Sequence, residues 1–420
     1  MATKRHVIIG NSAAGLAAAK AIRRHDSASI ITIISDEDCP AYSRVLTTYY
    51  LGGKTPREGI DYCDLSFYGQ YALQPYLGHR AIGLDIPGQR VLLDRGSPIS
   101  YDLLLIAAGA SPTFPSIPGI RRRGVFGLRT MGDAESIAAW SKKSREVVIL
   151  GAGLVSLQVA NALLSRGLKM TVVVKSSQIL SQMLDPEGAA RIETAMEREG
   201  VRVIKGLDAS EIRAGSRGAV REVVLEDGEV LPAQMVVVGK GVRPNTGFLE
   251  GSRIQIQNGI LVDKGMQTSV RNVYAAGDAA EGLDFLTGER RVSAIWPTAV
   301  SQGEVAGCNM AGVPADFEGF ISRNVTCLFG RVTASLGLTR AQGEGFEISS
   351  HAAPEPGVYR RLVLREGCLV GASLVGRIED AGTLFSLIRT RRILGSLREK
   401  AVRFPLKWGR VLLGERIYEG

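Results

Sequence analysis

The chain has 420 residues, 45% of them hydrophobic and 22% charged, which is ordinary for a soluble globular protein and too long for one core. Its formal net charge of +9 favours acidic partners. No apolar run approaches the roughly 20 residues of a membrane span, and the basic start leaves no room for a signal peptide, so we expect a cytoplasmic protein. Five scattered cysteines form no close pair, which argues against a metal site, a disulfide framework and a dithiol redox centre.

A strand, a glycine turn, a helix and a second strand open the chain. We predict strands over Arg5–Ile9 and Ser29–Ile34 and a helix over Leu16–Arg24. The turn between them lets the backbone approach a pyrophosphate, and the start of the helix offers free N–H groups. The turn residues expected to face a dinucleotide are Gly10, Ser12, Ala13, Ala14 and Gly15, with Ser12 in place of the usual second glycine.

An acidic residue after the second strand should bind the ribose hydroxyls of that dinucleotide. Asp36 is the first choice and Glu37 the alternative. The competing interpretation is a structural turn that binds no ligand.

The same pattern returns 141 residues later. Here we predict strands over Glu146–Leu150 and Met170–Val174 and a helix over Leu157–Ser165. One such unit is a weak signal, but two units with the correct neighbours indicate two dinucleotide sites. The second turn contributes Gly151, Gly153 and Leu154, and Ser156 stands where the third glycine would be.

Lys175 occupies the position where an NAD-specific site would carry an acid. A lysine cannot accept a hydrogen bond from a ribose hydroxyl, but it can pair with a 2′-phosphate, which favours NADP(H). A solvated lysine beside an unselective nucleotide site explains the sequence nearly as well.

Three further segments end in small residues. Residues 99–112 suggest one buried strand that ends at Ala107, Ala108 and Gly109. A strand within residues 229–241 leads to Gly241, and residues 272–279 lead to Gly277 and Asp278. Asp278 can accept a hydrogen bond from a polyol chain, or it can cap a helix.

The composition changes from about residue 318. Val358–Leu364 and Cys368–Val375 are typical of antiparallel strands, and a helix over Ala381–Thr390 follows. A basic tail closes the chain, and its cations are Arg389, Arg391, Arg392, Arg398, Lys400, Arg403, Lys407, Arg410 and Arg416. This tail is either a solvated face or a docking surface for an acidic redox protein. Nucleic-acid binding is disfavoured, because no recognised nucleic-acid-binding fold accompanies the charge.

Five motifs resemble those of the pyridine nucleotide–disulfide oxidoreductase superfamily, the two-dinucleotide flavoprotein reductases. They are Gly10-x-x-x-x-Gly15, the segments 107–112, 241–245 and 274–278, and Gly151-x-Gly153. Within this superfamily the chain looks most like the rubredoxin and ferredoxin reductases and the flavoprotein part of assimilatory nitrite reductase. That closer match rests on residues 41–44, 49–53, 124–130, 295–303 and 369–377.

The resemblance implies an α/β fold with two Rossmann-like domains and a C-terminal α+β domain. It places a discontinuous FAD domain at residues 1–118 and 243–317, an NAD(P) domain at 119–242, and an interface domain at 318–420. The first turn and Asp36 would bind FAD, with Arg44 near its phosphates, Asp278 at its ribitol, and Trp296 and Pro297 beside the isoalloxazine. Gly151, Gly153 and Lys175 would belong to the nicotinamide dinucleotide.

Disulfide-reducing relatives carry a redox cysteine on the helix after the second strand, and Ser43–Gly53 contains none. Cys39 lies just before that stretch, beside Pro40. Electrons should therefore leave the flavin directly for an external acceptor. The first hypothesis is an FAD-dependent NAD(P)H oxidoreductase that serves a rubredoxin, a ferredoxin or an iron–sulfur subunit, with no catalytic acid, catalytic base or metal. The alternatives are an oxidase acting on oxygen or peroxide, and a poorly active FAD-binding subunit or redox sensor of a larger complex.

Overall fold

The computed structural model describes residues 3–215, 218–352, 357–412 and 414. The chain divides into two compact units. The first unit comprises Met1–Tyr50, Lys54–Ser111 and Val242–Phe320, and the second comprises Leu51–Gly53, Pro112–Gly241 and Ile321–Gly420. The domain boundaries expected from the sequence stay a prediction, and Arg416 of the basic tail lies outside the described residues.

A five-stranded parallel sheet forms the centre of the first unit, with the strand order β19-β7-β1-β2-β3. Its strands are β1 (Arg5–Ile9), β2 (Ile30–Ile34), β3 (Leu73–Tyr76), β7 (Leu103–Ile106) and β19 (Val273–Ala275). The central strands are rich in isoleucine and leucine because helices and loops cover both faces of a parallel sheet. The predicted first strand is confirmed at both of its ends.

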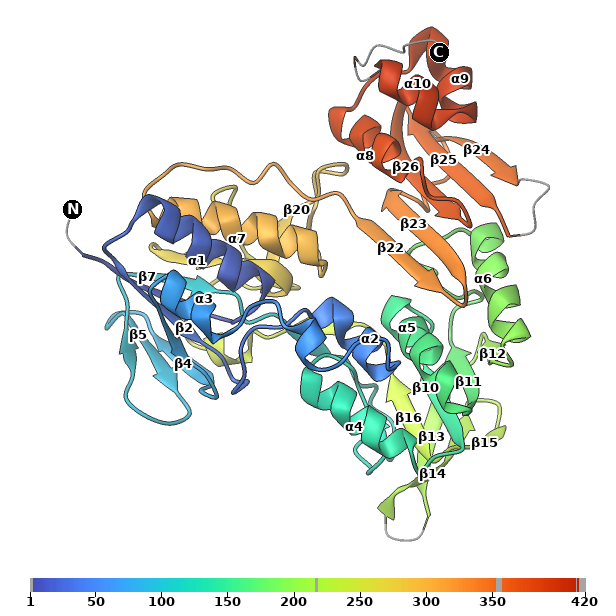
Figure 1. Ribbon diagram of the computed structural model, residues 1–420, viewed down its shortest axis with the longest axis horizontal. Coiled ribbons are helices and arrows are strands. Elements are labelled where there is room, and N and C mark those ends of the chain that lie inside the picture. The colour runs from blue at the N-terminus through green and yellow to red at the C-terminus, as the bar shows by residue number, and fades with distance from the viewer. Residues whose placement is uncertain (1–2, 216–217, 353–356, 413, 415–420) are drawn as a thin grey trace. The chain divides into compact units, whose positions relative to one another are not determined.

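Two helices of this unit pack against each other at very short range (Figure 1). They are α1 (Ala13–His25) and α7 (Trp296–Met310). A Cβ atom on Gly303 would lie 2.2 Å from the carbonyl oxygen of Ala14, and one on Gly307 would lie 2.5 Å from that of Ala18. The glycines of α7 therefore permit the contact, which fixes the middle of α7 beside the start of α1.

Smaller elements complete the first unit. They are α2 (Thr47–Leu51), α3 (Leu65–Gln70), the antiparallel strands β4 (Ala81–Asp85), β5 (Arg90–Leu93) and β6 (Ile99–Ser100), the pair β8 (Ala110–Pro112) and β17 (Val242–Pro244), and the three strands β18 (Ile260–Leu261), β20 (Ala280–Leu283) and β21 (Arg290–Val292). The last residues of α2 and β8 belong to the second unit. The prediction of one strand across residues 99–112 is wrong. Residues 99–100 pair with β5, β7 joins the parallel sheet, and residues 110–112 pair with β17.

The second unit contains another five-stranded parallel sheet, with the order β12-β11-β10-β16-β9. Its strands are β9 (Val125–Phe126), β10 (Glu146–Leu150), β11 (Lys169–Val174), β12 (Arg202–Lys205) and β16 (Met235–Val238). Its helices are α4 (Met131–Ser141), α5 (Leu154–Leu163) and α6 (Pro186–Arg198). An antiparallel sheet of β13 (Ala209–Ala214), β14 (Val220–Leu225) and β15 (Val230–Pro232) lies between β12 and β16 in the chain.

Residues after 321 form an antiparallel sheet with the order β22-β23-β26-β25-β24. Its strands are β22 (Arg323–Leu328), β23 (Arg331–Gly337), β24 (Glu347–Ala352), β25 (Tyr359–Arg365) and β26 (Cys368–Val375), and its helices are α8 (Ala381–Thr390), α9 (Arg398–Arg403) and α10 (Pro405–Leu412). The predicted antiparallel pair and the predicted helix α8 are confirmed. None of the helices in the described ranges combines the length and hydropathy of a membrane span.

Candidate functional site: two glycine turns

The first glycine turn connects β1 to α1. Gly10 has a φ of +127°, and a Cβ atom there would lie 2.1 Å from the carbonyl oxygen of Ala107. A Cβ atom on Gly15 would lie 2.0 Å from the carbonyl oxygen of Gly10. Both glycines are therefore required for the turn to form. Ala13 and Ala14 are buried behind it, each 6% exposed.

The amide groups at the start of α1 have no side-chain cap. Ser12 occupies the N-cap position, but its hydroxyl makes no capping hydrogen bond. In α4, by contrast, Thr130 and Asp133 form a complete capping box. Uncapped N–H groups at a helix start are suited to bind phosphate oxygens. The first turn therefore fits the pyrophosphate of FAD, because the Ser12 side chain does not occupy the N–H groups that would bind it.

The acids after β2 have different surroundings. Asp36 is exposed and lies 3.6 Å from a guanidinium nitrogen of Arg80. Glu37 accepts hydrogen bonds from the Tyr42 hydroxyl at 2.6 Å and from Arg44 at 2.5 Å. Asp36 is thus the more accessible acid, in line with its assignment to a ribose, which stays a prediction.

Arg44 is mostly buried and keeps its charge. Burial opposes the charged form, but the coulombic effects of Tyr42 and Glu37 and the hydrogen bond to Glu37 outweigh it and raise the pKa of Arg44 above its ordinary value. Glu37 thus pairs with this cation, and the assignment of Arg44 to the FAD phosphates stays a prediction.

The small residues after β7 lie at the carboxyl edge of the first sheet and are less buried than the strand. The strand itself is fully buried at Ile106, whereas Ala107, Ala108 and Gly109 are only half-buried. Asn245 fixes this segment from β17: its side-chain nitrogen donates to the Ala108 carbonyl at 2.9 Å, and its backbone N–H donates to that of Gly109 at 3.0 Å. Two motifs that lie far apart in the sequence are thus joined by one side chain.

Gly277 and Asp278 lie in a single turn of 3-10 helix, Gly277–Ala279, after β19. Ala276 occupies the N-cap position of that turn, so the interpretation of Asp278 as a helix cap is wrong. The N–H of Gly277 donates to the side-chain oxygen of Gln302 at 2.8 Å, and Gln302 is only 1% exposed. This buried glutamine of α7 orients the turn that carries Asp278.

Trp296 and Pro297 form the first turn of α7, and proline suits that position because its missing N–H has no partner there. The Trp296 ring packs edge-on against Tyr62, with 5.3 Å between ring centroids. Tyr62 also lies 5.4 Å from the Lys20 ammonium group. These contacts hold Trp296 within the first unit, and its place beside an isoalloxazine stays a prediction.

The second glycine turn connects β10 to α5. Gly151 has a φ of +105°, and a Cβ atom there would lie 2.4 Å from the carbonyl oxygen of Gly239. Gly153 occupies the N-cap position of α5 without a side-chain cap, and the helix begins at Leu154 rather than at the predicted Leu157. Ser156 donates from its hydroxyl to the Gly239 carbonyl at 3.1 Å. This bond joins the helix to the residue after β16, two positions before Gly241.

Lys175 follows β11 and forms an ion pair with Glu226. Its side chain is 62% exposed, so Lys175 is solvated as well as paired, and the choice between a 2′-phosphate partner and an unselective site stays open. Lys240, which follows β16, donates to both carboxylate oxygens of Asp208 at 2.6 and 2.8 Å. The sequence indicated a role for Lys175 but for neither of the two acids.

All five cysteines are free. Burial, followed by the nearby Glu37, raises the pKa of the Cys39 thiol. Burial likewise raises the pKa of Cys63 and of Cys308. These thiols stay protonated near neutral pH, which disfavours nucleophilic redox chemistry. The described residues also contain no cluster of histidine, cysteine and carboxylate side chains that could hold a metal ion.

Sequence reasoning missed several residues that position the first turn and the segments of the first unit that carry the other motifs. Asn245 and Gln302 lie within the family motifs, but the sequence does not show that their side chains bond to distant backbone groups. Tyr68 is a third case: its hydroxyl donates to the side-chain oxygen of Asn11 in the first turn at 2.9 Å. Burial raises the pKa of Tyr68 to about 12, so this donor keeps its proton. No periodicity in the sequence indicates these contacts.

Known proteins share this arrangement. The chain is 34% identical over 416 residues to the epsilon subunit of an NADH-dependent phenylglyoxylate dehydrogenase from Aromatoleum evansii, covering 98% of this chain and 97% of that one. It is 32% identical over 344 residues to an NADH oxidase from Methanocaldococcus jannaschii, covering 80% and 76%. The solved structure of a ferredoxin reductase for the CYP199A2 system from Rhodopseudomonas palustris superposes with a TM-score of 0.87 at 25% identity, covering 98% and 100%.

The family model described as pyridine nucleotide-disulphide oxidoreductase matches residues 4–303. That range includes both glycine turns, Asn245 with its bond to Ala108, and the turn at Gly277 that Gln302 orients. Members of the family use FAD with NAD(P)H, and the uncapped helix starts described above fit both dinucleotides. The chain belongs to the pyridine nucleotide-disulphide oxidoreductase family and is an NAD(P)H-dependent flavin oxidoreductase.

Proposed function

We propose that this chain passes electrons between NAD(P)H and an external iron–sulfur acceptor, either a rubredoxin or ferredoxin or an iron–sulfur partner subunit. Bound FAD supplies the conversion, because it accepts a hydride from nicotinamide and can release electrons singly. The observation that carries the proposal is the missing cysteine relay. Ser43–Gly53 contains no cysteine, and the thiol of nearby Cys39 has a raised pKa.

In this proposal the residues of the chain bind and orient, and none serves as an acid or a base. The first turn, from Gly10 to Gly15, binds the FAD pyrophosphate, with Asp36 or Glu37 at the ribose and Arg44 at the phosphates. Ala107, Ala108 and Gly109 leave space for the cofactor, and Asp278 holds its ribitol. Trp296 and Pro297 border the isoalloxazine. Gly151, Gly153, Leu154, Lys175 and Gly241 belong to the nicotinamide nucleotide.

The relatives support an acceptor outside this chain. The protein from Aromatoleum evansii is named as one subunit of a larger dehydrogenase, and the match covers almost all of both chains. Other relatives are named as rubredoxin and ferredoxin reductases, at 29% and 28% identity. A protein or subunit acceptor is therefore the proposal that these names support best.

The basic tail is the proposed docking surface for that acceptor. In its described part, Ile393, Phe404 and Leu406 are exposed apolar side chains. Arg403 lies 5.5 Å from the Phe404 ring, and Lys400 lies 4.8 Å from the Trp408 ring. Apolar groups surrounded by cations suit an acidic protein partner, since the charges steer the encounter and the apolar groups are buried in the complex.

Anaerobic titration of the purified flavoprotein with NADH and with NADPH, followed at the flavin absorbance band, tests the first half of the proposal. Bleaching by either nucleotide supports it, and no bleaching by both favours the poorly active subunit or sensor instead. The reduced protein is then mixed with an oxidised ferredoxin or rubredoxin, or with air-saturated buffer. Faster reoxidation by the iron–sulfur protein than by oxygen supports the proposal.

An oxidase is the second candidate, because one relative is named as an NADH oxidase. Rapid NADH consumption in air without any carrier, at a rate that exceeds transfer to every iron–sulfur protein tested, would favour it over the first proposal.

A further inference from the structure

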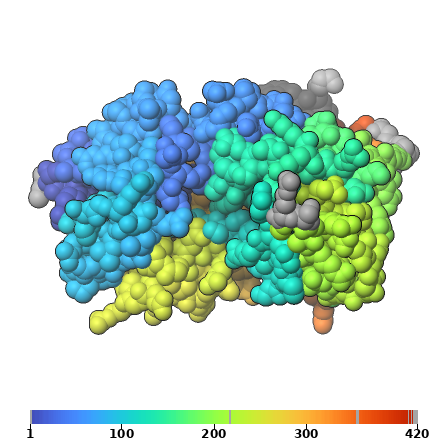
Figure 2. Space-filling model, turned by 90° about the horizontal axis from the view of Figure 1, so that it is seen from below, coloured from blue at the N-terminus to red at the C-terminus, as the bar shows by residue number. Residues whose placement is uncertain are grey.

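The three-stranded antiparallel sheet β13-β14-β15 of the second unit places two carboxylates at the edge of the parallel sheet of that unit. Asp208 directly precedes β13, and Glu226 directly follows β14. The backbone N–H of Glu226 donates to the carbonyl of Asp208 at 3.0 Å, so the two acids are neighbours. Figure 2 shows the yellow-green surface of this segment exposed beside the green surface of the same unit.

Each of these acids holds one lysine of the parallel sheet. Glu226 pairs with Lys175 at the end of β11, and Asp208 pairs with Lys240 at the end of β16. The two pairs differ in exposure: the side chains of Lys175 and Glu226 are 62% and 42% exposed, and those of Lys240 and Asp208 only 19% and 24%. The outer pair is therefore the one that an incoming ligand can reach and rearrange.

These charges lie where a dinucleotide ribose is expected. β10, β11 and β16 are parallel neighbours, so their carboxyl ends share one edge of the sheet. The N–H of Gly151 donates to the carbonyl of Val173 at 2.7 Å, which joins the glycine turn to the strand that ends just before Lys175. In this fold the residue after the second strand faces the adenosine ribose, where NAD carries a hydroxyl and NADP a phosphate.

We infer that Glu226 makes this site select NAD(H) over NADP(H). The inference rests on the proposed binding of a nicotinamide dinucleotide at the second turn. Glu226 already neutralises Lys175, so a 2′-phosphate with a charge near −2 would meet a carboxylate rather than a free cation. A ribose hydroxyl can instead donate to that carboxylate. The end of β11 carries Lys175 instead of an acid, and Glu226, 51 positions later in the chain, supplies the carboxylate.

The test is the affinity of the FAD-loaded protein for NAD⁺ and for NADP⁺, measured by isothermal titration calorimetry. We expect the unaltered protein to bind NAD⁺ more tightly. Glu226→Gln removes the negative charge and frees Lys175, so the affinity for NADP⁺ relative to NAD⁺ should rise by about 5-fold or more, the effect of one unit charge at ~4 Å in water. Glu229→Gln is the matched control, because it breaks an ion pair of similar exposure with Arg202.

The inference is overturned if the unaltered protein prefers NADP⁺, if Glu226→Gln leaves the ratio unchanged, if Glu229→Gln changes the ratio equally, or if neither nucleotide binds. Flavin bleaching is a separate readout for the proposed function. Nucleotide binding with the expected ratio but without bleaching would contradict the proposed electron transfer and leave the role of Glu226 supported. Bleaching by both nucleotides, with a ratio of NADP⁺ to NAD⁺ affinity that Glu226→Gln leaves unchanged, would support the proposed electron transfer and contradict the role of Glu226.

Discussion

The two glycine turns use the same backbone solution with different side chains. In each, a glycine at positive φ lies against a carbonyl oxygen of a neighbouring segment, Ala107 for Gly10 and Gly239 for Gly151. The first turn keeps its third glycine, Gly15, and replaces the second one with Ser12. The second keeps its second glycine and replaces the third with Ser156, whose hydroxyl bonds to Gly239. Each turn thus tolerates a serine at a different place.

The acids of the two turns also differ in origin. Asp36 and Glu37 lie just after β2, whereas Glu226, the acid that pairs with Lys175 after β11, comes from the end of β14. If these acids bind as proposed, the charge at a dinucleotide site is set by a remote hairpin in the second unit and by the strand end in the first. A sequence fingerprint that covers one βαβ unit includes the residue at the strand end but not the residues of a remote hairpin.

Gly10→Ala should have the largest effect. A Cβ atom there meets the Ala107 carbonyl at 2.1 Å in a conformation that alanine rarely adopts. We expect a cost of about 3 kcal/mol in the free energy of unfolding and loss of bound FAD. The measurements are the thermal unfolding midpoint and the ratio of flavin to protein absorbance.

Gly153→Ala is the matched control for that substitution. Gly153 has a φ of −78°, and a Cβ atom there would meet nothing within 4 Å beyond its immediate neighbours in the chain. FAD content should stay at the level of the unaltered protein. Equal FAD loss in both variants would contradict the role assigned to the first turn.

Gly151→Ala should separate the two sites. Its Cβ atom would meet the Gly239 carbonyl at 2.4 Å, and its φ of +105° is unfavourable for alanine. We expect FAD to be retained and NAD⁺ affinity to fall about 10-fold or more, corresponding to a local cost of about 1–3 kcal/mol. Calorimetry of the FAD-loaded variant measures this, and unchanged affinity would show that the second turn does not bind the nucleotide.

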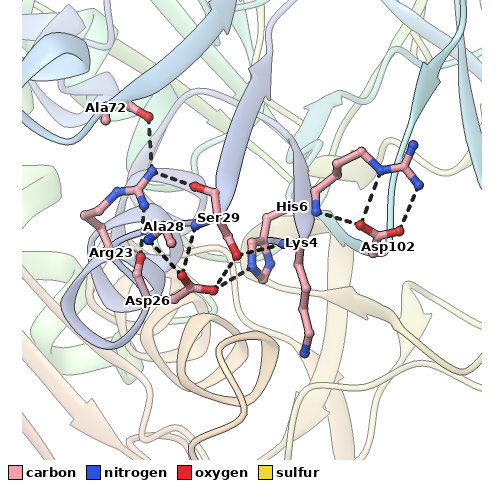
Figure 3. Close-up of polar contacts among 9 residues, drawn as sticks. Lys4, His6, Arg23, Asp26, Ala28, Ser29, Ala72 and Asp102 are labelled. Carbon is pink, nitrogen blue, oxygen red and sulfur yellow. Dashed lines mark hydrogen bonds and ion pairs between the residues drawn. The ribbon is translucent and has the colours of Figure 1, made fainter. Parts of the chain in front are cut away.

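The central strands of the two sheets differ in polarity at one buried position. His6 in β1 is fully buried, and the corresponding residue of β10 is Val147. A ring nitrogen of His6 lies 3.7 Å from the Asp26 carboxylate, too far for a hydrogen bond (Figure 3). Burial lowers the pKa of His6 below its ordinary 6.5, against a smaller opposing effect of Asp26.

Stability should therefore fall as the pH drops below about 6.5, because the unfolded chain binds a proton that the folded chain excludes. Burial of Asp26 would raise its pKa, but hydrogen bonds from Ser29 and Ala28 outweigh burial and lower it to about 2, so this carboxylate stays ionised throughout that range. His6→Val copies the second sheet and should reduce the fall in unfolding temperature between about pH 7.5 and 5.5. An unchanged fall would assign the pH dependence to other groups.

The sequence predicted the parts of this comparison that depend on local pattern. The strands β1, β10 and β26 and the helix α8 were located at their observed ends, because hydrophobic periodicity and glycine define them locally. Both dinucleotide helices begin earlier than predicted, since alanine and leucine continue the helix directly from the turn.

Long-range side-chain contacts could not be predicted in the same way. Asn245 reaches Ala108 across 137 residues, and Lys175 reaches Glu226 across 51. Such pairs depend on how antiparallel strands and loops return to a sheet edge, and no periodicity in the chain encodes that path. The sequence therefore showed the turns and the family resemblance, but not which charges meet at the second turn.

Ser156→Ala should have the smallest effect. It tests the position of the third fingerprint glycine, which is Gly15 in the first turn and Ser156 in the second. The substitution removes the hydroxyl that donates to the Gly239 carbonyl and should cost about 1 kcal/mol in the free energy of unfolding, with FAD retained. Ser156→Gly restores the fingerprint glycine but adds a helix-propensity cost of about 1 kcal/mol, so it should be less stable than Ser156→Ala. Ser165→Ala is the control, because its exposed hydroxyl makes only a 3.5 Å contact with Ala162. If Ser156→Gly proves the more stable of the two, the serine is merely tolerated at this position, and the bond to Gly239 does not replace the packing of a glycine.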